Sequence, residues 1–299
     1  MDIMTFVMDM IKGIFIGVAN IIPGVSGGTM AVSLGIYDKL IGAVSSLLSN
    51  WKKSLLTLLP IILGCGIGIV GFTYAIEYLL SKHTFVTCMA FVGLILGGVP
   101  VLVGTLRREM RHRRRSIGFG GIIAFLALFA LAAFLPMLSS GEEVLKTFSP
   151  TPGTLISLFL VGVIASATMV VPGVSGSLVM MVLGYYYGII ETIKNFLDAL
   201  KVLDMPGVLH GVLLLAPFGF GVLLGIFLIA KLITFLFKRY AIHTYCAILG
   251  LIAASPFAIF YNTGLFAQLG SLTPLTVILG VGAAVAGAVI TFLMGERSH

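Results

Sequence analysis

The sequence predicts an all-α protein that crosses a membrane several times, and three observations support this prediction. Of the 299 residues, 59% are hydrophobic and 10% are charged, and the mean hydropathy of +1.15 lies far outside the range of water-soluble domains. Apolar runs of about 20 residues, long enough to cross a bilayer as helices, recur along the chain. A short helix-breaking phrase also occurs twice inside apolar sequence.

The repeated phrase reads PGVSGG at residues 23–28 and PGVSGS at residues 172–177, which is 149 positions further on (172 − 23). A break inside a membrane segment leaves backbone N–H groups without intrahelical partners, and protein, water or a ligand must then bind them. Matching breaks in the two halves of a membrane protein are the best sequence indication of a transporter's binding site.

Further matches extend the repeat beyond this phrase. Gly35 matches Gly184 at the same offset, and a second group matches at an offset of 157 residues (217 − 60): Pro60, Gly64 and Gly68 with Pro217, Gly221 and Gly225. We therefore expect an internal duplication. The first repeat is expected over 1–138, an extracytoplasmic linker over 139–153 and the second repeat over 154–299.

Each repeat is expected to begin with a two-armed helical hairpin and to continue with three transmembrane helices. The first repeat contains a hairpin over 3–48 and helices over 55–80, 85–106 and 117–138, and the second contains a hairpin over 154–197 and helices over 208–237, 241–261 and 272–293. We favour re-entrant hairpins, although arms of this length also suffice to span the bilayer.

The placement of charge predicts the topology. A hairpin returns to the side from which it entered, so three crossings remain in each repeat and the second repeat has the inverted orientation. The basic run at residues 107–115 is expected in the cytoplasm by the positive-inside rule, and both chain termini then lie on that side. The net charge of +7 is attributed to cytoplasmic loops beside anionic headgroups, so no nucleic-acid partner is expected.

The two phrases have the chemistry of an anion site. Proline suits the first turn of a helix, glycine lets the backbone approach a ligand, and freed N–H groups at a helix N-terminus carry partial positive charge. Two such ends approaching from opposite leaflets would hold a phosphate. The groups expected to bind it belong to Ser26, Gly27, Gly28, Thr29, Ser175, Gly176 and Ser177, while Pro23, Gly24, Pro172 and Gly173 hold the breaks open. The alternative is a packing kink made of small residues.

Lys12 and Asn20 are the polar residues of the first arm that we add to the phosphate site. Lys12 either pairs with Asp9, which shares its helical face, or points inward to the anion. Asn20 either orients the first break or makes a buried amide hydrogen bond. Glu77 and Lys231 lie near segment ends, where long side chains extend to the headgroups, and Glu77 is also a candidate proton-coupling carboxylate.

An enzyme is not expected. Residues 24–28 match the Gly-x-Ser-x-Gly nucleophile pattern, but the match fails at Ser177 in the second copy, and the five histidines all fall at or near segment ends. The three cysteines lie in apolar segments without metal-ligand spacing, so neither a metal nor another cofactor is expected.

Two longer stretches resemble a known family. Residues 12–37, with KG, GVANIIPGVSGGT and LGIY, and residues 171–186, with VPGVSGS and LGYY, resemble the two signatures of a bacterial membrane family. This family was long catalogued as domain of unknown function 368 and is now described as polyprenyl-phosphate transporters. One departure is Asn20, where we expect Asp in many relatives, so a role that needs a carboxylate there, such as proton coupling, is in doubt.

The resemblance implies a function. It implies that the protein moves undecaprenyl phosphate, a C55 lipid carrier, from the outer to the inner leaflet of the bacterial cytoplasmic membrane for reuse in cell-wall polymer synthesis. A proton or sodium ion is a possible coupling partner, and an oligomer is possible. The alternative is a transporter or channel for a small soluble anion that uses the same paired phrases.

Overall fold

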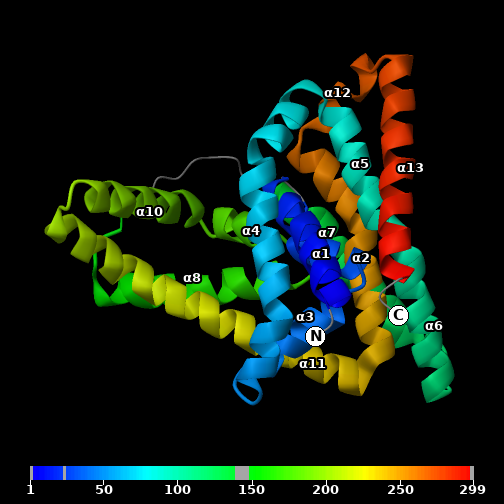
Figure 1. Ribbon diagram of the computed structural model, residues 1–299, viewed down its shortest axis with the longest axis horizontal. Helices are drawn as coiled ribbons and strands as arrows, with labels where there is room; N and C mark the ends of the chain where they lie inside the picture. Colours follow the sequence, from blue (N-terminus) through cyan, green and yellow to red (C-terminus); the bar gives the residue numbers. More distant parts are fainter. Residues whose placement is uncertain (1–2, 23–24, 139–147, 297–299) are drawn as a thin grey trace. The chain divides into compact units, whose positions relative to one another are not determined.

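The structure, a computed structural model, describes residues 3–22, 25–138 and 148–296, and these residues form helices and connecting segments without a β-strand (Figure 1). The predicted helix breakers Pro23 and Gly24 and most of the predicted linker, residues 139–147, lie outside the described residues. The all-α prediction is therefore confirmed for the part of the chain that the structure describes.

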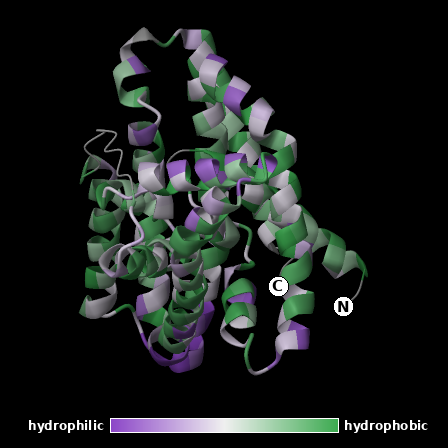
Figure 2. Ribbon diagram, turned by 90° about the vertical axis from the view of Figure 1, so that its left-hand side faces the viewer, coloured by the Kyte–Doolittle hydropathy of each residue, from purple (hydrophilic) through white to green (hydrophobic). Residues whose placement is uncertain are grey.

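Among the described residues, seven helices are long and apolar enough to cross a membrane, or up to eight if a bent pair forms one span. They are α1 (Ile3–Ile21), α4 (Trp51–Lys82), α5 with α6 (Thr84–Gly97 and Val99–Arg113), α7 (Phe119–Phe134) with the 3₁₀ turn η1 (Leu135–Leu138), α8 (Pro152–Val170), α11 (Met205–Asn262) and α13 (Pro274–Glu296). Hydrophobic residues cover most of these helices (Figure 2). The protein is thus a polytopic helical membrane protein.

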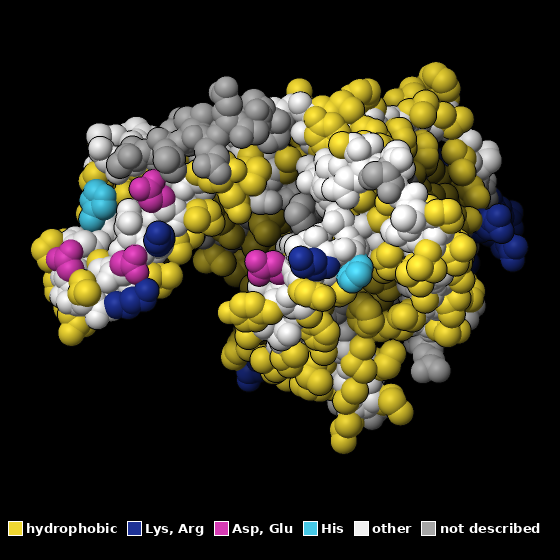
Figure 3. Space-filling model, turned by 90° about the horizontal axis from the view of Figure 1, so that it is seen from above, with side chains coloured by type: hydrophobic (Ala, Val, Ile, Leu, Met, Phe, Trp, Pro, Cys, Tyr) yellow, Lys and Arg dark blue, Asp and Glu magenta, His cyan; other side chains and the backbone are white. Residues whose placement is uncertain are grey.

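The remaining helices are short: α2 (Gly27–Ser33), α3 (Tyr37–Ser45), α9 (Gly176–Val182), α10 (Tyr186–Lys201), α12 (Leu265–Gln268) and the 3₁₀ turn η2 (Leu269–Ser271). The axes of α9 and α10 differ by 109°, which makes this pair either a broken span or a re-entrant loop. Hydrophobic side chains dominate the visible surface in Figure 3, and charged side chains and histidines form a few small groups. This surface is suited to contact with lipid.

The chain divides into two compact units. Unit 1 contains residues 1–136, 171–174 and 230–299, and unit 2 contains residues 137–170 and 175–229. Unit 1 therefore includes the first phrase together with the Pro172-Gly173-Val174 part of the second phrase. The two units are described separately below.

Backbone contacts at glycines define the helix packing of unit 1. A Cβ on Gly64 of α4 would collide with the carbonyl oxygen of Met10 in α1, and one on Gly13 would collide with that of Ile61. A Cβ on Gly93 of α5 would meet the Ala284 carbonyl of α13 in the same way. Small residues permit this close approach, which membrane helices use because burial of apolar side chains gains little in lipid. The pairs α1–α4 and α5–α13 are therefore tightly packed (Figure 1).

In unit 2, α8 and α11 repeat the α1–α4 glycine contacts at the offsets of 149 and 157 residues found in the sequence. Gly162 lies against the Phe218 carbonyl, as Gly13 does against Ile61. Gly221 lies against the Phe159 carbonyl, as Gly64 does against Met10. The matched contacts support the predicted duplication, whereas the relative orientation of the two repeats stays a prediction.

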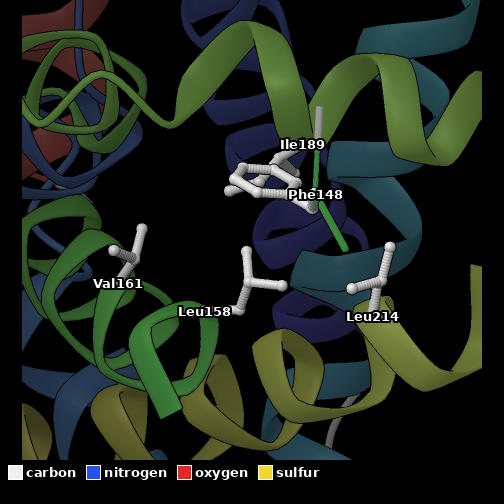
Figure 4. Close-up of a cluster of buried hydrophobic side chains, with 5 residues drawn as sticks. All are labelled: Phe148, Leu158, Val161, Ile189 and Leu214. Atoms are coloured by element: carbon white, nitrogen blue, oxygen red, sulfur yellow. The ribbon is translucent and has the colours of Figure 1, made fainter. Parts of the chain in front are cut away.

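Apolar side chains also hold unit 2 together. Its buried cluster brings three helices and the segment before α8 together, and consists of Phe148, Leu158, Val161, Ile189 and Leu214 (Figure 4). The Phe148 ring stacks on Tyr185 with centroids 5.7 Å apart. This cluster lies between α8 and α10, the two arms of the second predicted hairpin.

Two helical segments differ in detail from the expected ones. The segment expected as one helix over 85–106 is interrupted at Gly98, where α5 ends and α6 begins with Pro100 in its first turn. Proline removes one backbone donor and is favoured at a helix start, which explains a new helix there. The segments expected over 208–237 and 241–261 are joined as α11 across a kink at Tyr240 (φ −131°, ψ 40°).

Candidate functional site

The first phrase is the connection between α1 and α2. Ser26 caps α2 in an extended conformation (φ −105°, ψ 137°), and its Oγ accepts a hydrogen bond of 3.2 Å from the Gly28 N–H. Ser26 is buried. A serine at this position satisfies a backbone donor that the helix itself cannot pair.

Asn20 accepts a hydrogen bond from a second backbone N–H group at the start of α2, that of Gly27. Its Oδ1 accepts a hydrogen bond of 3.2 Å from the Gly27 N–H, and its Nδ2 donates to the carbonyl of Ile16 at 3.0 Å. A Cβ on Gly27 would lie 2.7 Å from this Nδ2, so only glycine leaves room for the amide. Asn20 thus holds the first phrase in place from the last turn of α1.

Thr29 joins the first phrase to the second within unit 1. The Gly173 N–H donates a 2.6 Å hydrogen bond to Thr29 Oγ1, and the Thr29 side chain is 1% exposed. Gly173 has a φ of +76°, and a Cβ there would lie 2.9 Å from the Leu251 carbonyl oxygen. Residues 144 positions apart are therefore brought into direct contact, in a conformation that requires glycine.

The later part of the second phrase lies in unit 2, where Ser175 caps α9 in an extended conformation (φ −98°, ψ 123°). The hydroxyls of Ser175 and Ser177 are 2.8 Å apart and share a hydrogen bond. A Cβ on Gly176 would collide with Met169. The hydroxyls that the sequence predicted as phosphate ligands are thus paired with each other.

The two phrases adopt the same local structure. The Met30 N–H bonds to the Ser26 carbonyl and the Val179 N–H bonds to the Ser175 carbonyl, both at 3.1 Å. A glycine with positive φ ends each short helix, Gly35 at +69° and Gly184 at +72°. The repeated sequence therefore specifies a repeated motif, a helix of seven residues with serine at its N-cap position and a left-handed glycine after its end, although only Ser26 makes a side-chain capping hydrogen bond.

Lys12 lies at the opposite end of α2 from the first phrase. Its Nζ donates to the Leu34 carbonyl at 3.0 Å, and seven residues of helix, about 10 Å of rise, separate this end from Ser26. Asp9 forms its ion pair with Lys39 of α3. The structure therefore gives Lys12 a contact that neither sequence-based alternative included, a cation at the negative end of a helix.

Some contacts of unit 1 had no signal in the sequence. Tyr245 Oη donates to Asp38 Oδ2 at 3.0 Å across 207 positions. Asp38, Tyr245, Tyr37 and Phe237 also line a pocket at the C-terminal end of α2.

Other predicted residues are placed as follows. The side chains of Glu77 and Lys231 are not covered by neighbouring helices, as expected for groups that extend to the headgroups. Within the described ranges, no group of three or more His, Cys, Asp or Glu side chains is arranged to hold a metal ion.

A sequence profile described as undecaprenyl phosphate translocase-like matches residues 16–269, which include both phrases and most of the helices. The chain belongs to the undecaprenyl phosphate translocase-like family. The family to which the two signatures pointed is thereby confirmed.

Two relatives of this chain are both named polyprenyl-phosphate transporters. The chain is 30% identical to a polyprenyl-phosphate transporter of Staphylococcus aureus (strain NCTC 8325 / PS 47) over 255 residues, which cover 85% of this chain and 86% of the relative. It is 29% identical to a polyprenyl-phosphate transporter of Vibrio cholerae serotype O1 (strain ATCC 39315 / El Tor Inaba N16961) over 224 residues, 70% of this chain and 68% of the relative. No solved structure gives a significant match.

Proposed function

We propose that this protein transports a polyprenyl phosphate, with undecaprenyl phosphate as its substrate, from the outer to the inner leaflet of the bacterial cytoplasmic membrane. The carrier would then be available again for cell-wall polymer synthesis. The observation that carries the proposal is the hydrogen bond between Thr29 and Gly173, because it joins two buried glycine-rich phrases inside a family of translocases. The names of the two relatives support the same substrate class.

The chemistry of the substrate explains why such phrases are needed. A phosphate monoester carries up to about two negative charges at neutral pH. Moving that charge through hydrocarbon without polar partners is prohibitive. Backbone N–H groups and hydroxyls supply partners without placing a full positive charge in the bilayer, while the prenyl tail stays in lipid.

Three backbone donors of the two phrases are occupied by protein oxygens. Asn20 Oδ1, Ser26 Oγ and Thr29 Oγ1 accept from the N–H groups of Gly27, Gly28 and Gly173. We infer that phosphate oxygens replace these three acceptors when the substrate binds, so that each donor exchanges one hydrogen bond for another. Such an exchange is favourable because hydrogen bonds to a charged acceptor are stronger than those to a neutral one.

The proposed transport cycle follows from the duplication. The two repeats have inverted topology, both termini lie in the cytoplasm, and the hairpins are re-entrant and open toward opposite leaflets. Movement of one repeat against the other would expose the phosphate site to each leaflet in turn. A proton or sodium gradient is the proposed driving force.

A transporter fits the contacts of Ser26 better than a hydrolase does. A nucleophilic serine donates its proton to a neighbouring base. Ser26 Oγ instead accepts from the Gly28 N–H as a helix cap. We therefore propose a role in binding and not in covalent chemistry.

Transport is tested in proteoliposomes that contain the purified protein and fluorescent undecaprenyl phosphate. A membrane-impermeant quencher reports the fraction of lipid in the outer leaflet over time. Exchange between leaflets that is faster than in protein-free vesicles supports the proposal. An unchanged rate, together with flux of inorganic phosphate through the same vesicles, would favour a transporter of small soluble anions.

Ser26→Ala combined with Ser175→Ala should lower binding of undecaprenyl phosphate in a lipid-binding assay, because each hydroxyl, once displaced from its present partner, would donate a hydrogen bond to the phosphate. The helical content by circular dichroism should stay near the wild-type value. Unchanged binding would contradict the assignment of these phrases to phosphate.

A further inference from the structure

Charged side chains of α1 hold the first hairpin together. Asp9 pairs with Lys39 of α3, and Lys12 donates to the Leu34 carbonyl at the end of α2. Asp9 and Lys12 are only 4% and 3% exposed, whereas the Lys39 side chain is 37% exposed. One of the two charges buried on α1, Asp9, is therefore paired with a residue that reaches the outside of the protein.

The second hairpin has no charge at the corresponding positions. Leu158 stands where Asp9 does, Val161 where Lys12 does and Gly188 where Lys39 does, each 149 positions further on. The correspondence is structural, because the glycines that follow Lys12 and Val161 make matching backbone contacts. Leu158 and Val161 belong to the apolar cluster of unit 2 (Figure 4).

The fold therefore does not need charges at these places. Removing an ion pair from water costs more than its attraction commonly returns, and apolar side chains of similar size hold helices at least as well. The second hairpin demonstrates the apolar solution in the same chain. Buried charges that packing does not require are best attested as registry or switch elements.

The contacts of α2 indicate what would be switched. Asn20 holds its N-terminal end and Lys12 holds its C-terminal end, both from α1. Between them Thr29 accepts the hydrogen bond from Gly173. A change at either end of so short a helix moves all the donors of the first phrase.

We propose that Asp9, Lys12 and Lys39 form a latch, the α1 latch, whose opening lets α2 move and frees the first phrase for the substrate phosphate. The proposal rests on the proposed function. Phosphate bound at the first phrase, about 10 Å of helix away from Lys12, would favour the open latch through the movement of α2 that the latch restrains. Lys12 and Lys39 act as positioning residues. Asp38, the charged neighbour of Lys39 in sequence, accepts a hydrogen bond from Tyr245 Oη.

The deciding variant makes the first hairpin resemble the second. In Asp9→Leu/Lys12→Met/Lys39→Met the latch is replaced by apolar contacts that cannot open in response to charge. The unfolding temperature in detergent should be unchanged or higher. Leaflet exchange of undecaprenyl phosphate in proteoliposomes should fall at least about tenfold, a loss that corresponds to one hydrogen bond to a charged group. Wild-type exchange in this variant would overturn the proposal, as would a lower unfolding temperature together with the loss.

A conservative variant covers the case in which the triple variant does not fold. Lys39→Met should lower leaflet exchange, because Asp9 loses its ion-pair partner. Lys39→Arg keeps the charge and should retain wild-type exchange. Equal exchange by Lys39→Met and Lys39→Arg would contradict a latch between Asp9 and Lys39.

Amide hydrogen exchange tests the latch without substrate. Lys12→Met alone removes the contact with Leu34 and should speed exchange at residues 27–33 about tenfold, while residues 176–182 keep their rate. Gly42→Ala in α3, where a Cβ meets nothing within 4 Å, is the control and should leave both segments unchanged. Equal rates at 27–33 in wild type and Lys12→Met would overturn the latch. Slow leaflet exchange by the wild type would instead count against the proposed function, so the two failures are distinguishable.

Discussion

Three backbone donors set the properties of the first phrase at the scale of single residues. The N–H groups of Gly27, Gly28 and Gly173 each bind a side-chain oxygen. A hydrogen bond of this kind contributes about 0.5–1.5 kcal/mol to stability, so each acceptor matters as long as no ligand replaces it. Small changes at these positions therefore have effects that can be measured.

Gly27→Ala should disrupt the contact with Asn20, because its Cβ would lie 2.7 Å from Asn20 Nδ2. The amide is the end of a movable side chain, so we expect it to shift and lose its hydrogen bond, with a loss of stability of about 0.5–1.5 kcal/mol and a clear loss of transport. Gly42→Ala is the control, since a Cβ there meets nothing within 4 Å. Thermal unfolding and leaflet exchange are measured on both, and equal results for the two would argue against a tight first phrase.

Thr29→Val keeps the shape of the side chain and removes the acceptor of the Gly173 N–H. The variant should be destabilised by about 1–3 kcal/mol. Thr29→Ser keeps the hydroxyl and should lose less. Chemical denaturation of the two variants gives the comparison, and a valine variant as stable as the serine variant would show that the Gly173 donor has another partner.

Glycine contacts dominate at the scale of helical elements. The same pairs of positions bring α1 against α4 and α8 against α11, although the side chains around them differ. In lipid, close backbone approach replaces the hydrophobic effect as the source of helix association. The spacing of small residues is therefore the part of the sequence that encodes helix pairing.

Gly64→Ala should weaken the α1–α4 pair, because its Cβ would collide with the Met10 carbonyl oxygen, which cannot move without the helix. A loss of about 1–3 kcal/mol is expected. Gly66→Ala, two residues along the same helix and without a neighbour within 4 Å, should be neutral or slightly stabilising. Unfolding temperatures that are equal for the two variants would contradict this packing.

At the scale of the whole molecule, the proposed topology makes the two sides of the membrane distinct. The loop between α4 and α5 should lie outside the cell, and the loop after α6, with its arginines, should lie in the cytoplasm. Cysteine labelling of intact cells tests this arrangement.

A single cysteine at Ser81 should react with a membrane-impermeant maleimide in intact cells, in a background where Cys65, Cys88 and Cys246 are serine. A single cysteine at Ser116 should react only after the cells are permeabilised. Reversed labelling would place the arginine run outside and would contradict both the proposed orientation and the proposed direction of transport.

The repeated motif was predictable because it is local. Ser26 and Ser175 cap short helices, and Gly35 and Gly184 end them with positive φ, as expected from residues whose backbone preferences are strong. The membrane class followed from composition for a similar reason: a bilayer core accepts few charged residues and long apolar helices.

Long-range contacts required the tertiary structure. Spacing placed Asp9 and Lys12 on one face of α1, and packing adds partners from other segments, Lys39 for Asp9 and the Leu34 carbonyl for Lys12. The contact of Thr29 with Gly173 joins positions that share no local signal. Sequence spacing specifies which side chains share a helix face, whereas the partner of a buried charge or donor depends on which helices pack together. Composition and local spacing alone therefore decide the class, the helices and the repeated motif of this protein. Packing decides which side chains bind the backbone donors of that motif.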